Sequence, residues 1–198
     1  MARNDERRRL LTDAGIDVLA ADGMRGLTHR AVDARAGVPT GTASNYFRSR
    51  EALVGALVER IGERLAPDPA VHAQWRDRTP TPALFADYTR DIVRRLSAER
   101  DVTLALFTLR LEAARSPAIA SALGDWMRAG FAADVAFNRD AGLPGGAFEI
   151  ALFHYAIEGL ILDRLTVPID PEASTDEIVE AFVEGLLGGR TGDGERRG

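Results

Sequence analysis

The 198-residue sequence contains no cysteine and no lysine. Without cysteine the chain can form no disulfide, no thiolate zinc site and no cysteine nucleophile. No apolar run reaches the roughly 18–20 residues that a membrane helix needs, and the N-terminus lacks the apolar core and cleavage site of a signal peptide. We therefore expect a cytoplasmic protein that does not contact a membrane. Alternating β-branched runs bounded by turn residues are also missing, which argues against a sheet.

The charge is unevenly distributed along the chain. The net charge is -5, but residues 1–50 hold nine arginines against six acids, and residues 51–198 hold sixteen arginines against twenty-four acids. A basic head on an acidic body predicts local contact with a polyanion rather than a protein that coats nucleic acid over its whole surface.

Apolar residues recur at spacings of three and four, which predicts helices throughout. We expect an all-α fold in which a three-helix N-terminal head is joined by a linking helix to a C-terminal helical bundle. The predicted domains are a head at 1–48, a body at 49–187 and a flexible, glycine-rich tail at 188–198. The expected helices span 6–21, 28–36, 39–47, 49–65, 82–98, 101–114, 117–140, 145–166 and 174–187.

The pattern of residues 28–47 predicts two short helices around a turn at Gly37. Small apolar residues form the seam between these helices: Val32, Ala36, Ala43 and Phe47. The second helix of such a unit can enter the DNA major groove with its N-terminal residues toward the base edges. Periodicity alone leaves a second interpretation open, namely a plain helical hairpin with a polar surface.

The segment AVDARAGVPTGTASNYFRSREALVGAL resembles the DNA-binding head of TetR-type bacterial transcriptional repressors. The resemblance rests on linked motifs that cover about residues 8–60: Gly37-Val38, Gly41-Thr42, Tyr46-Phe47 and Ser49-Arg50-Glu51-Ala52-Leu53. The rest resembles the family in length and helix layout, and in the segment LEAARSP at 111–117. Two positions depart from the family pattern: Ser44 replaces an aromatic residue, which puts the operator sequence in doubt, and Arg50 replaces a lysine.

The resemblance implies which residues contact DNA. It implies base-edge roles for Arg30, Thr40, Gly41, Ser44 and Asn45, and phosphate roles for Thr28, Thr42, Tyr46 and Arg50. Arginine can pair with guanine and asparagine with adenine, whereas hydroxyls and guanidinium groups suit phosphate oxygens. Arg48 is a further DNA-binding candidate, although a solvated surface position explains it equally well.

The helix at 145–166 is apolar on nearly every side, so it must be buried on both faces. In a chain of this size a second copy is the simplest cover, and the resemblance also implies a homodimer. The last helix adds an apolar stripe of its own. The dimer-interface candidates are Phe148, Leu152, Tyr155, Leu160, Ile178, Phe182 and Leu186.

The resemblance also implies a ligand cavity in the body, for an effector that the sequence does not identify. The candidate lining is aromatic and aliphatic with a few polar groups: Phe85, Tyr88, Phe107, Thr108, Leu111, Trp126, Phe131, Phe153 and His154. For each of these residues, ordinary core packing is the competing interpretation. His154 and Glu158 have a spacing that can bind a metal, but a third ligand is not evident. We expect a buried, hydrogen-bonded histidine, no metal and no cofactor.

Three functions remain to be weighed. The first is a ligand-responsive homodimeric regulator, most simply a repressor, that binds a palindromic DNA operator. The second is a helical small-molecule-binding or enzymatic bundle whose head does not bind DNA. The third is a DNA-binding dimer without a ligand. The three histidines lie in different elements, and neither a Ser/His/Asp set nor a phosphate-binding glycine loop is present, so we do not expect an enzyme.

Overall fold

The computed structural model describes residues 2–188, which form two compact units. Within that range, unit 1 comprises residues 2–66 and 99–128, and unit 2 comprises residues 67–98 and 129–188. Residues 2–188 contain helices and no strand, so the predicted all-α fold is confirmed. None of these helices is both long and apolar enough to span a bilayer. Apart from Gly188, the tail predicted at 188–198 lies outside the described residues.

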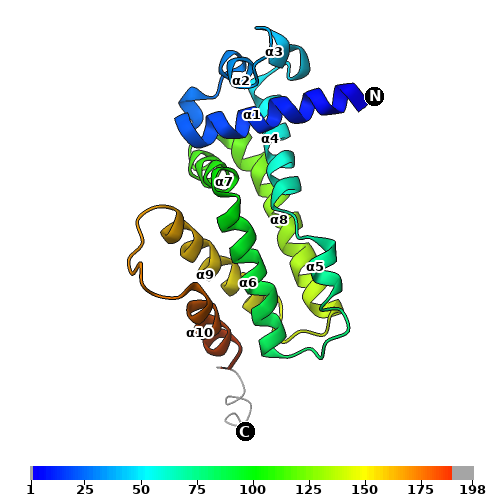
Figure 1. Cartoon of the computed structure of the whole chain (residues 1–198), viewed down its shortest axis with the longest axis vertical. Coiled ribbons are helices and arrows are strands. Elements are labelled where there is room, and N and C mark those ends of the chain that lie inside the picture. Colours follow the sequence, from blue (N-terminus) through cyan, green and yellow to red (C-terminus); the bar gives the residue numbers. More distant parts are fainter. Residues whose placement is uncertain (1, 189–198) are drawn as a thin grey trace. The chain divides into compact units, whose positions relative to one another are not determined.

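Unit 1 contains the head and the helices that support it. It is built from α1 (Ala2–Gly26), α2 (His29–Arg35), α3 (Thr42–Tyr46), α4 (Arg50–Leu65), α7 (Arg100–Ala113) and the first half of α8 (Pro117–Asp140). Helix α1 packs against α2, α4 and α7, and α3 packs against α2 (Figure 1). Its core is apolar and fully buried at Leu11, Leu19 and Leu57.

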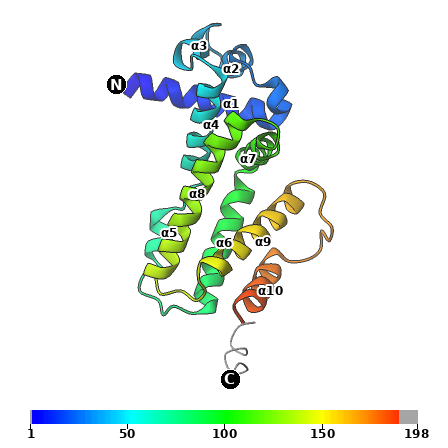
Figure 2. The same cartoon turned by 180° about the vertical axis from the view of Figure 1, so that it is seen from behind.

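Unit 2 consists of α5 (Pro69–Ala73), α6 (Pro82–Ala98), the second half of α8, α9 (Ala147–Leu165) and α10 (Thr175–Gly188). Helices α6, α9 and α10 pack against one another (Figure 2). Their shared core includes Phe85, Phe153, Ile161 and Val179. In α9, Ile150, Phe153 and Ile157 face this core, so only one side of this apolar helix is buried within the chain.

Most predicted helices are confirmed within one or two residues, because their caps are legible in the sequence. The Thr28 side chain accepts a hydrogen bond from the Ala31 N–H at the start of α2. Ser49 does the same for the Ala52 N–H at the start of α4. The predicted seam of the head is confirmed at Val32, Ala43 and Phe47, which are buried, whereas Ala36 is only half-buried.

Three helix predictions need correction. The first helix starts at Ala2 rather than near residue 6 and leaves helical geometry at Gly23, where φ is 65°. Helix α3 begins at Thr42 rather than at Pro39-Thr40, because Gly41 has a φ of 95° and forms a turn. Helix α5 was not predicted, because Pro67-Asp68-Pro69 indicates the end of the preceding helix. Its Asp68 side chain caps the Ala70 N–H and Pro69 occupies the first turn, where proline is tolerated.

Candidate nucleic-acid interface

The short helix α3 is held in place by a buried carboxylate from α2. Asp33 is 2% exposed. Its Oδ2 accepts a hydrogen bond from the Gly41 N–H at 2.7 Å, and its Oδ1 accepts one from the Ala43 N–H at 2.6 Å. The backbone N–H groups at the start of a helix have no partners within the helix and favour negative charge. Asp33 therefore caps α3 from a distance and fixes its orientation on α2.

Four of the predicted DNA-binding side chains are exposed and unengaged. Arg30, Thr40, Asn45 and Arg48 are all exposed, and their side chains make no hydrogen bond or ion pair within residues 2–188. Asn45 projects from α3 itself. Because they have no internal partner, these groups can bind another molecule without breaking a bond in the fold.

Three further candidates, Thr28, Thr42 and Ser44, carry hydroxyls that differ in their readiness to donate a hydrogen bond. The Thr28 oxygen accepts the bond of its cap, so its own proton is available to a phosphate oxygen. The Thr42 hydroxyl donates to the Pro39 carbonyl at 2.5 Å, and the Ser44 hydroxyl donates to the Gly41 carbonyl at 2.9 Å. Thr42 and Ser44 must break these bonds before they can donate elsewhere.

The remaining three candidates are engaged in the fold. The Gly41 N–H is bound to Asp33. Tyr46 is half-buried with its ring 6.4 Å from the ring of Phe47. The Arg50 guanidinium donates to the Met24 carbonyl and so joins the start of α4 to the end of α1. Arg50 therefore connects two helices of the head, in addition to the phosphate role that the resemblance implies.

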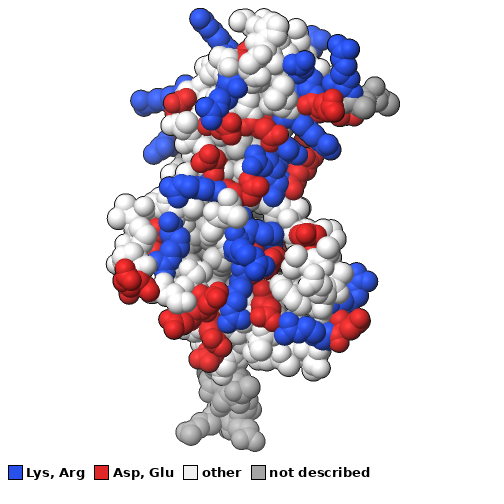
Figure 3. Space-filling model, in the orientation of Figure 1, with Lys and Arg blue, Asp and Glu red and all other residues white. Residues whose placement is uncertain are grey.

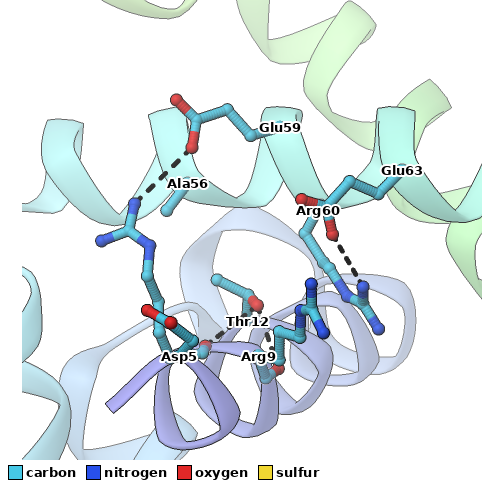
Figure 4. Close-up of a pocket in the computed structure, with 8 residues that line it drawn as sticks. Asp5, Arg9, Thr12, Ala56, Glu59, Arg60 and Glu63 are labelled. Carbon is cyan, nitrogen blue, oxygen red and sulfur yellow. Dashed lines mark hydrogen bonds and ion pairs between the residues drawn. The ribbon is translucent and has the colours of Figure 1, made fainter. Parts of the chain in front are cut away.

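Ion pairs join α4 to the neighbouring helices of unit 1. Arg60 binds both oxygens of Asp13 on α1, at 2.9 and 3.0 Å. It also pairs with Glu63 one turn along α4 at 2.8 Å (Figure 4). Its hydrogen bonds to Asp13 raise the pKa of the Arg60 guanidinium. Arg64 pairs with Glu99 just before α7. Helix α4 is thus tied to α1 and α7 by charge as well as by its buried apolar side.

The N-terminal part of α1 also contributes to the head. Arg8 lies over the Phe47 ring at 5.1 Å and pairs with Glu59 of α4 at 3.5 Å, and both Arg8 and Glu59 line a groove between α1 and α4. The groove has a volume of about 190 Å³, and six of its eight lining residues are charged. On the face drawn in Figure 3, arginines and acids are interspersed over both units. Any attraction of this face to DNA therefore depends on particular arginines.

A second close contact in unit 1 joins α4 to α8. A Cβ built on Gly62 would lie 2.6 Å from Nε1 of Trp126. Only glycine leaves room for the indole ring at this point of α4. Trp126, predicted as a pocket residue, therefore packs against the helix that follows the head.

The nine predicted pocket residues divide between the two units. Phe107, Thr108, Leu111 and Trp126 belong to unit 1, and Phe85, Tyr88, Phe131, Phe153 and His154 belong to unit 2. Leu111 points outward from α7 and is 70% exposed. The rings of Phe85 and Phe153 are 4.6 Å apart in the core of unit 2, while those of Phe131 and His154 are 5.6 Å apart.

His154 is not the buried residue that we expected. Its side chain is 36% exposed and its Nε2 lies 3.0 Å from Oδ2 of Asp134, which is itself 55% exposed. The histidine is hydrogen-bonded, as predicted, but it is only half-buried.

The predicted interface residues lie on two helices of unit 2. Phe148 is 62% exposed and Tyr155 is 70% exposed on α9. Leu152, Ile178, Phe182 and Leu186 are half-buried. Leu160 is only 8% exposed in the single chain, so a partner chain would find little of it to cover.

Sequence reasoning missed two groups of residues. Asp33 gave no periodic signal because it lies beside the buried Val32 and its hydrogen bonds are to residues eight and ten positions later. His72, Trp75 and Phe137 form an aromatic cluster with the predicted Tyr88. The first two of these residues were missed because the helix that carries His72 was not expected.

Comparison with known proteins points to a single family. The family model described as bacterial regulatory proteins, tetR family, matches residues 11–57. A second, described as tetracyclin repressor-like, C-terminal domain, matches residues 80–189, which is more than half of the chain. No curated protein matches the sequence at a significant level.

Solved structures share the fold. A TetR-family member from Streptomyces coelicolor is 26% identical with a TM-score of 0.67, and 92% of this chain and 98% of that one are covered. The multidrug binding protein EbrR, in complex with malachite green, is 25% identical with a TM-score of 0.64 and the same coverage. A transcriptional regulator from a Rhodococcus species is 22% identical, with a TM-score of 0.63 and coverage of 91% and 94%.

Proposed function

Because the chain belongs to the TetR family of bacterial regulatory proteins, we propose that it is a transcriptional repressor that responds to a small molecule. In this proposal a homodimer binds a palindromic DNA operator, and an effector releases it. The observation that carries the proposal is the Asp33-capped helix α3 with an exposed, unengaged Asn45. The cap fixes the direction of the helix, and the amide of Asn45 can pair with an adenine edge.

The DNA-contacting surface follows from which side chains are unengaged. Arg30, Thr40 and Asn45 are assigned to base edges and the Thr28 hydroxyl to a phosphate. Arg48, exposed just beyond α3, is assigned to the phosphate backbone. Base contacts discriminate between sequences, whereas phosphate contacts add affinity for every sequence and make it depend on salt. The two classes therefore predict different behaviour for substitutions on the same surface.

An apolar stripe on α9 supports a homodimer. Phe148, Tyr155 and Leu162 recur at a spacing of seven residues, and they are 62%, 70% and 44% exposed. A seven-residue repeat places these side chains along one side of a helix, the arrangement by which helices associate. On α10, Ile178, Phe182 and Leu186 are half-buried and follow the spacing of a helical stripe. A second copy would cover these residues, and a dimer would present two α3 helices to a two-fold operator.

The similarity to EbrR, solved with malachite green, supports a small-molecule effector for this chain. An effector releases DNA if it binds better to the conformation that fits the operator poorly. Effector and operator then weaken each other through a shared coupling free energy of about 1–3 kcal/mol.

The first experiment is a selection of operator sequences from random duplex DNA with the purified full chain. We expect a palindromic consensus whose half-sites are spaced by whole turns of the duplex.

Once the consensus is known, two substitutions distinguish base contacts from phosphate contacts. Asn45→Ala should lose about 1–3 kcal/mol of discrimination at one base pair in each half-site. Arg48→Gln should instead weaken binding to all sequences and reduce the salt dependence. The absence of enrichment at low salt from a verified dimer would reject DNA binding.

A further inference from the structure

Four aromatic rings of unit 2 form a cluster beside α5. His72 lies on α5, Trp75 follows it, Tyr88 lies on α6 and Phe137 on α8. The Tyr88 ring meets those of His72, Trp75 and Phe137 edge-on, with centroids 5.0, 4.9 and 5.1 Å away. The His72 ring stacks on Trp75 at 5.9 Å. These separations are typical of attractive ring pairs.

This aromatic cluster is open to solvent. Phe137 is 41% exposed, the His72 side chain is 25% exposed and Trp75 is half-buried. Helix α5 buries none of its residues. Apart from its ring contacts, the segment 69–78 contacts α6 through polar side chains. His72 Nε2 lies 3.6 Å from Oδ2 of Asp91, and Arg78 forms an ion pair with Asp87 at 2.7 Å. Part of the surface of the His72, Trp75 and Phe137 rings is therefore accessible from solvent.

The acids of α6 near the cluster are paired with arginines. Residues 76–95 contain five arginines and three aspartates, and one of these arginines, Arg90, also pairs with Asp176 and Glu180 of α10. The buried Asp91 is already paired with Arg94 at 2.7 Å and Arg95 at 2.8 Å. Asp87 is paired with Arg78 and Arg90. The acids closest to the rings are thus neutralised and would give little attraction to a cationic ligand.

Arg76 supplies a cation without a partner. It follows Trp75 directly, it is exposed, and it makes no ion pair within residues 2–188. Burial raises the pKa of the Tyr88 phenol, and the charges of Arg78 and Arg76 act in the opposite direction. Asp77 lies between these two arginines and leaves the segment net positive.

We propose that the aromatic cluster binds a small planar aromatic anion, with the ring of the ligand among His72, Trp75 and Phe137 and its carboxylate on Arg76. The site offers faces for stacking and a guanidinium for charge-assisted hydrogen bonding. Its role as an effector site rests on the proposed repressor function, whereas binding itself can be measured without DNA.

Three probes of one shape test the proposal: benzoate is anionic, benzamide is neutral and benzamidine is cationic. The full chain carrying Trp126→Phe leaves Trp75 as its single tryptophan, so that quenching of its fluorescence reports the site. We expect benzoate to bind more tightly than the other two. Arg76→Gln should weaken benzoate binding about tenfold and leave benzamide unchanged. The control Arg115→Gln, at an exposed position of unit 1, should change neither.

Equal affinity for the three probes, preference for benzamidine, or benzoate binding that Arg76→Gln does not weaken would each overturn the proposal. Isothermal titration calorimetry of the full chain carrying Trp75→Ala provides a second measurement. The heat of benzoate binding should be lost in this variant. Because no operator is present in these titrations, their failure is distinct from a failure of DNA binding.

Discussion

Asp33 is a buried carboxylate that accepts its hydrogen bonds from backbone N–H groups. Both of its oxygens are used by N–H groups at the start of α3. In Asp33→Asn the amide NH2 would face one of those donors, and the helix would lose its cap. We expect a loss of about 1–3 kcal/mol in the free energy of unfolding, measured by urea denaturation.

The same Asp33→Asn substitution should also weaken operator binding, because the orientation of α3 depends on the cap. Asp22→Asn is the matched control, since Asp22 is exposed and makes no hydrogen bond or ion pair in the described chain. If both variants kept the stability and DNA affinity of the parent, Asp33 would have no role as a cap.

Asp91 provides a residue-scale prediction about pH. Burial acts to raise its pKa, but hydrogen bonds from Arg94 and Arg95 outweigh burial and hold the pKa below the ordinary value. A carboxyl whose pKa is lowered by folding stabilises the protein above its unfolded pKa of about 3.9. That contribution is lost as the pH falls through the lower, folded value.

Asp91→Asn should therefore be less stable than the parent by roughly 2–4 kcal/mol at pH 7, because a buried pair is broken. The difference should shrink as the pH falls below 4, which urea denaturation over a pH series measures. Asp125→Asn is the control, since Asp125 is 74% exposed and its pair with Arg128 lies in solvent. A difference that stayed constant down to pH 3 would contradict the argument.

Helix α4 carries two glycines that the sequence alone does not distinguish. A Cβ at Gly62 would meet the Trp126 indole, whereas one at Gly55 would meet nothing within 4 Å. Gly62→Ala should cost about 1–3 kcal/mol through overpacking. Gly55→Ala should instead stabilise the helix by about 0.5–1 kcal/mol.

Thermal and urea unfolding of the two alanine variants test this contrast, and Trp126→Phe should recover part of the loss in the Gly62→Ala background. Two variants with equal stabilities would show that the indole moves aside without cost.

At the scale of elements, the sequence predicted best where the punctuation is local. Thr28 and Ser49 mark helix starts through bonds to residues three positions away, so their effect is legible in a short window. The start of α3 depends on a carboxylate ten residues earlier and on the φ of Gly41. Helix α5 contains no buried residue, so the sequence shows no apolar periodicity that would predict it.

For the molecule as a whole, the association of two chains can be tested on α9. Tyr155 and Leu111 are both 70% exposed, in unit 2 and unit 1 respectively. Because each side chain faces solvent in the single chain, Tyr155→Arg and Leu111→Arg should both leave the fold intact. On sedimentation we expect Tyr155→Arg to become monomeric and Leu111→Arg to remain dimeric. Operator affinity should fall only for Tyr155→Arg. A dimer in both variants would exclude the α9 stripe as the interface.

The candidate DNA-contacting surface is a prediction from the motifs, and its internal bonding could not be predicted from them. Arg30 and Asn45 are exposed and unengaged, in keeping with the roles that the resemblance implies for them. That Arg50 donates to Met24, twenty-six residues earlier, depends on how α1 and α4 pack. Leu160 illustrates the same limit, because α9 is apolar all round and only its packing shows which residues are already covered.

The noncontiguous make-up of unit 1 has a consequence for building hybrid regulators. A chimera that joins the first 48 residues of this chain to the body of a relative would keep Asp13 but lose Arg60, its partner in two hydrogen bonds. Extending the transplanted piece to residue 66 would restore that pair yet leave Arg64 without Glu99 and Gly62 without Trp126. A graft that preserves these contacts needs two segments, residues 2–66 and 99–128, exchanged together.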